Sequence, residues 1–218
     1  MDKLDYKKAY PELYLPPRTP ILIDVPAMPF IMVEGCGDPN EEDGAYSDAV
    51  ELLYSLSYTI KMSHKSGSMP EGYFEYAVPP LEGLWWMKEG RAPDFLHKEN
   101  FCWISMIRQP DFVTPDVFAW AQSQVKRKKP ALTPSSARLQ TFVEGYCVQC
   151  MHIGPYAAEP ATVARMELFM HEQGLIHDFN APLSGGLLRR HHEIYLNDPR
   201  KTSPDKVKVV LRHPVVKK

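Results

Sequence analysis

The sequence feature that most limits the fold is a repeated order of predicted elements. Residues 20–110 contain an apolar extended segment, a helix and two further strands, and residues 139–216 contain the same succession again. The last strands of the two stretches also read alike, with Met-Ile-Arg-Gln-Pro at 106–110 and Val-Leu-Arg-His-Pro at 210–214. A repeat of this length predicts two half-domains of one type, related by a pseudo-two-fold axis.

Helix signals support the same division. Residues 42–62 and 159–174 each place apolar side chains close to helical spacing. Between the two stretches, Thr114 followed by proline is a typical helix start, so residues 111–138 are interpreted as a connector that begins with a helix. The sequence therefore predicts an α+β protein with one domain over residues 1–218, made of two half-repeats and a connector.

The charge and hydropathy of the chain disfavour several classes of protein. The net charge of −2 argues against a nucleic-acid binder, because phosphate contacts require a concentrated Lys/Arg surface. The N-terminal segment is charged throughout and does not resemble a signal peptide, and no stretch reaches the roughly 20 apolar residues that a membrane span needs. We expect a cytoplasmic protein with no direct nucleic-acid partner and no membrane partner, and the oligomeric state is left open.

Motifs for cofactors, metals and covalent catalysis are not evident. The chain has no phosphate-binding glycine loop and no serine nucleophile elbow. Cys147 and Cys150 lie three apart on a predicted strand, so they face opposite sides and cannot close on one ion, and Cys36 and Cys102 are isolated in the sequence. We expect no metal and no cofactor.

The segment 191–198, HHEIYLND, raises the main functional question. Residues two apart on a strand share a face, so His191, Glu193 and Tyr195 lie together. One interpretation is a solvated face. The other is a pocket in which burial raises the pKa of Glu193 and suits it to proton transfer. His152 with His191 and Glu193 would also make a two-His, one-carboxylate iron set, but the sequence supplies no firm third ligand.

Several long blocks of the chain resemble GyrI-like small-molecule-binding proteins, in the stand-alone form without a DNA-binding domain. The blocks occur in the order expected for that family and are spread from residue 54 to residue 215. They are YSLSYTIK (54–61), EYAVPPLEGLWW (75–86), WISMIRQP (103–110), EGYCVQCMHIGPYAAEP (144–160) and HHEIYLNDPRKTSPDKVKVVLRHPV (191–215).

The resemblance implies a pair of βαββ repeats with antiparallel sheets around a central ligand groove. In the family that groove holds flat aromatic or cationic molecules, and members fused to helix-turn-helix domains are drug-sensing transcription factors. One stand-alone subfamily hydrolyses the strained cyclopropane of DNA-alkylating natural products, using an aromatic cage and a glutamate. By this resemblance, Glu193 is the acidic residue of the pocket.

Aromatic side chains are the candidates for the cage, although a regularly spaced aromatic residue is more often part of a core. Trp85 and Trp86 are adjacent and face opposite ways on a strand, so at most one of them points into the groove. Tyr156 follows a Gly-Pro turn and is expected to fold over the groove mouth. The expected ligand-binding side chains are Tyr54, Tyr76, Trp85, Trp103, Met106, His152 and Tyr195.

The leading hypothesis is a hydrolase that protects the cell from flat alkylating xenobiotics. Glu193 is expected to act as general base for a water that attacks the cyclopropane, and Tyr156 to stabilise charge on the carbonyl oxygen. The alternative is a non-catalytic sequestering or sensor module in which Glu193 is the counter-charge of a cationic ligand. An inhibitor of DNA gyrase is disfavoured, because a net charge of −2 is small for a DNA mimic.

Overall fold

The computed structural model describes residues 3–90 and 97–218. The chain forms two compact units. Unit 1 comprises Met1–Tyr6, Met28–Pro79 and Trp85–Thr141, and unit 2 comprises Lys7–Ala27, Pro80–Leu84 and Phe142–Lys218. The helices are α1 (Tyr6–Ala9), α2 (Pro11–Tyr14), α3 (Ala45–Lys61), α4 (Pro115–Lys128) and α5 (Glu159–Glu172). The strands are β1 (Ile21–Cys36), β2 (Leu81–Met87), β3 (Phe101–Arg108), β4 (Ala137–Ile153), β5 (Leu175–His177), β6 (His191–Tyr195) and β7 (Lys208–Lys217).

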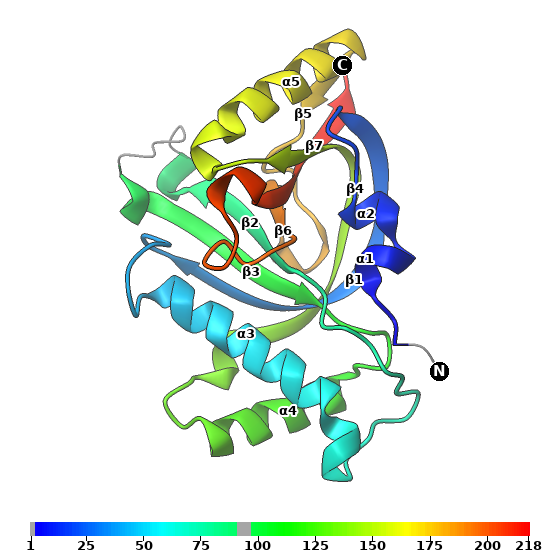
Figure 1. Ribbon diagram of the computed structural model, residues 1–218, viewed down its shortest axis with the longest axis vertical. Helices are drawn as coiled ribbons and strands as arrows, with labels where there is room; N and C mark the ends of the chain where they lie inside the picture. Colours follow the sequence, from blue (N-terminus) through cyan, green and yellow to red (C-terminus); the bar gives the residue numbers. More distant parts are fainter. Residues whose placement is uncertain (1–2, 91–96) are drawn as a thin grey trace. The chain divides into compact units, whose positions relative to one another are not determined.

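The predicted succession of elements is present twice. The first series is β1–α3–β2–β3 and the second is β4–α5–β6–β7, with α4 between them and the short β5 added after α5 (Figure 1). The pairings of β1 with β3, and of β4, β5 and β6 with β7, are all antiparallel. The α+β class with antiparallel strands is therefore confirmed, while the pseudo-two-fold axis, the central groove and the limits of the half-repeats stay predictions.

Unit 1 is organised around α3, which contacts both β3 and α4. The buried residues of α3 recur at intervals of three and four, so they form one continuous face of the helix; they are Ala49, Leu52, Leu53, Leu56, Ser57 and Ile60. The N-terminus of α4 is capped as expected, because the Thr114 hydroxyl accepts a hydrogen bond from the backbone N–H of Val117 at 3.3 Å. Among the described residues, no helix combines the length and the apolarity needed to cross a membrane.

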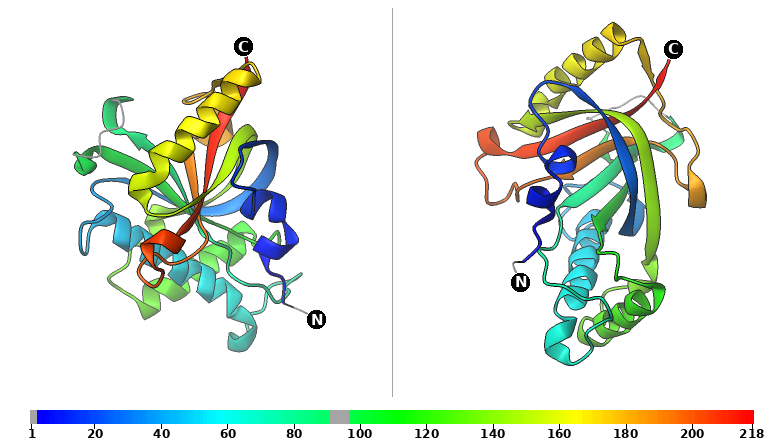
Figure 2. Two further views of the ribbon diagram at one scale, coloured as in Figure 1. Left: turned by 45° about the horizontal axis from the view of Figure 1, so that its top comes forward. Right: turned by 90° about the vertical axis from the view of Figure 1, so that its right-hand side faces the viewer.

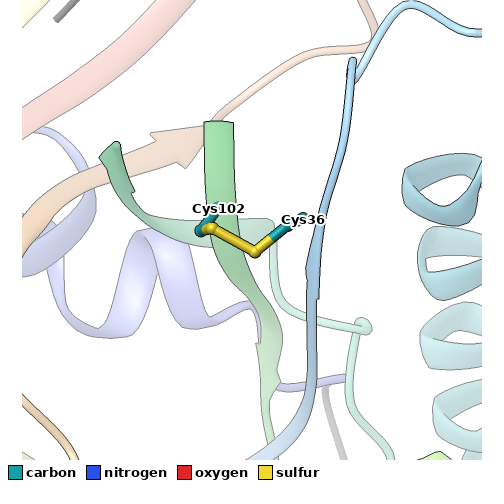
Figure 3. Close-up of a disulfide and its surroundings, with 2 residues drawn as sticks. All are labelled: Cys36 and Cys102. Carbon is teal, nitrogen blue, oxygen red and sulfur yellow. A yellow bond between two sulfur atoms is a disulfide. The ribbon is translucent and has the colours of Figure 1, made fainter. Parts of the chain in front are cut away.

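A disulfide joins two strands of unit 1. The antiparallel register of β1 and β3 sets Phe30 opposite Arg108 and continues to Cys36 opposite Cys102, and the two sulfurs are bonded (Figure 3). The interpretation of these cysteines as isolated is wrong, because strand register brings together residues that are 66 positions apart in the sequence. Cys147 and Cys150 are free and buried.

Unit 2 is built on β7. β4 pairs with it along Cys147↔Pro214 to Ile153↔Lys208, β6 pairs along His192↔Arg212 to Tyr195↔Val209, and β5 pairs near its end. The helix α5 lies alongside β7 (Figure 2), and its methionines pack against the valines and leucines of the strands. The members of this core are Val148, Cys150, Met166, Met170, Leu175, Val207, Val209, Leu211 and Val215.

Candidate functional site

Strand β6 presents two different faces, as the alternation of its sequence predicts. His192 and Ile194 are buried, whereas His191, Glu193 and Tyr195 are half-buried. The half-buried face is therefore neither core nor open surface. A carboxylate on such a face is only partly exposed to solvent.

Glu193 is bound by a neighbouring histidine. Its Oε1 lies 3.0 Å from Nε2 of His191, and the two side chains are 14% and 25% exposed respectively. The other ring nitrogen of His191, Nδ1, lies 2.7 Å from Nε2 of the buried His213 on β7. Glu193 is thus the outer end of a hydrogen-bonded chain that leads into unit 2.

Tyr156 lies within electrostatic reach of the same carboxylate. It follows the Gly154–Pro155 turn, in which Gly154 adopts a φ of 140° that favours glycine. Burial raises the pKa of Tyr156 to about 12, with Glu193, Glu159 and Asp198 adding to the effect through their negative charges. The phenol, which is still 42% exposed, therefore keeps its proton at neutral pH and can donate a hydrogen bond.

Glu159, the first residue of α5, is the acid that sequence analysis missed. Burial, followed by the charge of Glu193, raises the pKa of Glu159 to about 9, so its carboxyl group carries a proton at neutral pH. Its Oε1 is buried without a hydrogen-bond partner among the described residues. In the sequence Glu159 reads as an ordinary acid in the first turn of a helix, and no local pattern connects it to Glu193.

The buried face of β6 carries an ion cluster. Both ring nitrogens of His192 lie 3.0 Å from a carboxylate, Nδ1 from Glu144 and Nε2 from Glu82, and Arg212 donates to Glu144 at 2.9 Å. All four side chains are at most 2% exposed. Since both nitrogens face acceptors, His192 is an imidazolium; Glu144 and Glu82 raise its pKa to about 9 despite its burial. The pKa of Glu144 falls to about 2 beside His192 and Arg212, against the opposing effect of burial.

This cluster also fastens the N-terminal segment to unit 2. Arg212 donates to the carbonyl of Leu13 at 2.9 Å, and the amide of Gln149 donates to the carbonyl of Glu12 at 2.6 Å. Tyr14, itself 1% exposed, donates to Glu82 at 3.4 Å. The segment that precedes β1 is therefore part of the packed structure behind β6.

Unit 1 contains an aromatic cluster that includes two of the expected cage residues. The Tyr46 ring lies 5.4 Å from Trp85 and 5.3 Å from Trp103, and Trp85 is 6.2 Å from Phe101. A Cβ at Gly35 would lie only 2.4 Å from the Trp103 ring, so glycine is required for this close approach. Tyr46 was not among the residues expected for the cage.

The other expected residues of unit 1 lie elsewhere. Tyr76 is 1% exposed and packs with Tyr6, Phe74 and Phe112, in an aromatic core of its own. Met106 is fully buried, and Tyr54 on α3 is half-buried with its ring 6.3 Å from that of Tyr58. The structure therefore separates this part of the expected list into core and partly exposed positions.

The remaining expected residues belong to unit 2. His152 is buried, with Nδ1 2.9 Å from the Thr162 hydroxyl and Nε2 3.2 Å from the Pro155 carbonyl, so both nitrogens are engaged. Tyr195 packs partly against the unit 2 core. Among residues 3–90 and 97–218, no group of three or more His, Cys, Asp or Glu side chains is arranged to hold a metal ion.

Comparisons with known proteins identify a family and several similar structures. A model of the GyrI-like small molecule binding domain matches residues 18–215. A hydrolase from Listeria innocua is 44% identical with a TM-score of 0.86, covering 98% of this chain and 100% of its own. A second hydrolase structure from that organism is 45% identical with a TM-score of 0.87, covering 99% and 100% respectively. An uncharacterized conserved protein from the same organism is 46% identical with a TM-score of 0.89, covering 98% and 100%.

More distant comparisons add only the fold. The C-terminal domain of EcmrR is 11% identical, with a TM-score of 0.52 over 92% of this chain and 98% of its own. No curated protein matches the chain.

Proposed function

The chain belongs to the family of GyrI-like small-molecule-binding domains, and on that basis we propose that it is a hydrolase that opens the cyclopropane ring of flat alkylating agents. In this role it protects the cell from such xenobiotics. Two Listeria innocua structures that are 44% and 45% identical over nearly the whole chain are described as hydrolases, which supports the type of reaction. The substrate class comes from the family resemblance and is part of the proposal.

The observation that carries the proposal is the contrast between Glu193 and its neighbours. Glu193 is half-buried with one oxygen bound by His191, while Tyr156 and Glu159 keep their protons because burial and the charge of Glu193 raise their pKa values. A carboxylate can take up a proton from water, whereas a phenol or carboxyl group that keeps its proton can donate it. Here Glu193 is the base, and Tyr156 and Glu159 are the proton donors.

This arrangement suits ring opening by water. Glu193 removes a proton from water while the water oxygen bonds to the cyclopropane methylene carbon. The bond from that carbon to the ring system breaks, and its electron pair moves through the conjugated dienone to the carbonyl oxygen. A hydrogen bond from Tyr156 stabilises the charge there, and the oxygen then takes a proton to give a phenol. The balance is the gain of one water, and the strain of the ring supplies much of the driving force.

An aromatic cluster of unit 1 is, taken by itself, a candidate surface for flat ligands. Tyr46, Trp85 and Trp103 lie in one cluster, and Trp85 and Tyr46 are half-buried rather than fully covered. Aromatic rings give large contact areas with few rotatable bonds, which favours binding of planar molecules. We propose Trp85 as a ligand contact, while the fully buried Tyr76 and Met106 act at most behind other side chains.

The test is incubation of the purified protein with a cyclopropane-bearing alkylating compound, followed by mass spectrometry of the small molecule. We expect a gain of one water over many turnovers. Glu193→Gln should lower the rate by about 10²- to 10⁴-fold because the general base is lost, while binding is retained. If the glutamine variant turns over at the wild-type rate, Glu193 is not the base.

A matched control lies in the same chain. His97 and Glu99 have the same spacing, with His97 Nδ1 3.1 Å from Glu99 Oε1, but their side chains are 63% and 66% exposed. Glu99→Gln should leave the rate unchanged, since this pair lacks the buried surroundings of Glu193. An equal loss in both variants would mean that the measured effect is not specific to the proposed site.

The second candidate is a binding protein without turnover, and the acidic surroundings of Tyr156 favour it. Glu193 acts on that phenol, so a cationic ligand would find compensating charge there. In this case the compound stays unchanged and binds stoichiometrically. Planar aromatic cations should then raise the melting temperature of the wild type more than that of Glu193→Gln.

A further inference from the structure

Glu193 is one end of a hydrogen-bonded series of three titratable side chains. Its Oε1 lies 3.0 Å from His191 Nε2, and His191 Nδ1 lies 2.7 Å from His213 Nε2. The inner member, His213, is 5% exposed. The proposed general base is thus connected to the interior through two imidazole rings.

Strand geometry explains why these three side chains meet. Glu193 and His191 are two apart on β6 and share a face. The antiparallel register that sets Glu193 opposite Leu211, and His192 opposite Arg212, leads in its next step to His213. Glu193 and His191 are thus joined along β6, and His191 and His213 are joined across from β6 to β7. The two strands fix the geometry of the three side chains.

The positions of the protons on the two histidine rings follow from what each end of the hydrogen-bonded series can accept or donate. Ionised Glu193 can only accept, so His191 carries its proton on Nε2 and, when neutral, leaves Nδ1 bare. That bare nitrogen accepts from Nε2–H of His213. The remaining nitrogen of His213, Nδ1, is then unprotonated, which suits a buried atom that has no hydrogen-bond partner among the described residues. Every hydrogen bond in the chain therefore points toward Glu193.

We propose that His191 and His213 are positioning residues that orient Glu193, so that one carboxylate oxygen is bound and the other is presented to water. The inference deepens the proposed function, on which its kinetic part rests. His213 sets the tautomer: a second proton on His191 would sit on Nδ1 and force His213 to hold a proton on its buried, unpartnered nitrogen. A cationic His191 would pair with Glu193 and weaken it as a base.

The groups around the chain support a neutral His213. Burial lowers the pKa of His213 well below its ordinary value, and His191 and His177 lower it further. The His177 ring, from β5, lies 5.2 Å from it, and the Phe179 ring lies at the same distance. On the outer side, the groups that act electrostatically on or beside Glu193 come from the start of α5 and the loop after β6; they are Tyr156, Glu159 and Asp198.

The kinetic test uses three variants and the hydrolysis assay. His191→Leu should lower kcat by about tenfold to a hundredfold, because Glu193 loses its orientation. His191→Gln, whose amide still donates to Glu193, should recover most of that loss. His213→Phe should move the acidic limb of the pH–rate profile to higher pH, because His191 is now free to accept a proton on Nδ1. His97→Gln is the control and should show wild-type kinetics.

A spectroscopic test separates this inference from the proposed function. Long-range ¹H–¹⁵N spectra of the histidine rings report which nitrogen is protonated, with or without turnover. We expect Nε2–H tautomers for His191 and His213 in the wild type, and protonation of His191 at higher pH in His213→Phe.

The outcomes are distinct. If the wild type does not hydrolyse the compound, the proposed function fails and the ring spectra still decide the positioning role. The positioning role is wrong if His191 carries its proton on Nδ1 in the wild type, or if its protonation is unaffected by His213→Phe. A wild-type kcat in His191→Leu would overturn it as well. Should His191→Leu fail to fold, His191→Gln and the spectra remain decisive.

Discussion

An Arg-x-Pro sequence occurs at the end of β3 in unit 1 (108–110) and within β7 in unit 2 (212–214). The side chains of the two sequences make different contacts. In unit 1 the Arg108 guanidinium lies 4.8 Å from the centre of the Tyr6 ring. The amide of Gln109 donates to the Ser57 hydroxyl at 3.1 Å and to the carbonyl of Ile107 at 3.0 Å. These contacts join the end of β3 to an aromatic ring and to α3.

In unit 2 the same positions are part of ionisable networks. Arg212 donates to Glu144 at 2.9 Å behind β6, and His213 contacts His191 on the other face at 2.7 Å. The difference comes from the neighbouring strands: β4 supplies a buried carboxylate and β6 supplies two histidines and a glutamate. The same short sequence pattern thus occurs in both units, while the chemistry of its side chains is set by residues far away in the sequence.

The largest effect that tests this comparison is expected for Arg212→Met. The cluster behind β6 contains two carboxylates and two cations, all nearly inaccessible to solvent. Removal of Arg212 leaves an uncompensated buried charge, which costs about 3–5 kcal/mol of unfolding free energy. Urea unfolding monitored by tryptophan fluorescence measures this loss.

Arg108→Met is the matched variant in unit 1. Its guanidinium contact with the Tyr6 ring is of a kind that contributes about 1 kcal/mol, so we expect a smaller loss than for Arg212→Met. Equal losses of unfolding free energy would mean that Arg108 and Arg212 contribute alike to stability. A larger loss in Arg108→Met would reverse the expected order.

The pH dependence of stability gives the next largest effect. The folded pKa of His192 is raised to about 9, so its contribution is fully present below its ordinary pKa of 6.5 and is lost as the pH rises through 9. Glu144 has the opposite sign: its folded pKa is lowered to about 2, so its contribution is present above 4.5 and is lost as the pH falls toward 2. We expect maximal stability from this cluster between pH 4.5 and 6.5.

Above that range, unfolding free energy should decline by at most about 3 kcal/mol up to pH 9, from the shift of His192. Urea titrations at several pH values measure the slope. Glu82→Gln removes one of the two carboxylates that face His192, so the slope should become shallower. A slope that is the same in the wild type and this variant contradicts a role for His192.

The parts of the fold that depend on residues close together in the sequence were predicted from local pattern. The spacing of apolar residues predicted α3 and α5, and the alternation along β6 predicted that Glu193 shares a face with His191 and Tyr195. Whether that face is solvated or buried was left open, and in the structure it is half-buried. The repeated order of elements predicted the succession of strands and helices. These features require only residues that are close in sequence.

The parts that could not be predicted depend on strand register and long-range contacts. Glu159 becomes an acid with a raised pKa only because it is buried near Glu193. His213 becomes a partner of His191 only through the pairing of β6 with β7. Tyr76 was expected to contact a ligand. It packs against aromatic rings from several segments of the chain and is part of the core.

The smallest expected effect completes the comparison and comes from Ser57→Ala in unit 1. Ser57 is buried on α3 and accepts a hydrogen bond from Gln109, whose amide nitrogen also donates to the carbonyl of Ile107. Because that second bond remains, we expect a loss of about 1 kcal/mol. Neither partner titrates, so the loss should be equal at pH 6 and pH 9 in urea unfolding. A loss that changes with pH would mean that the end of β3 is coupled to a titrating group, as Arg212 and His213 are in unit 2.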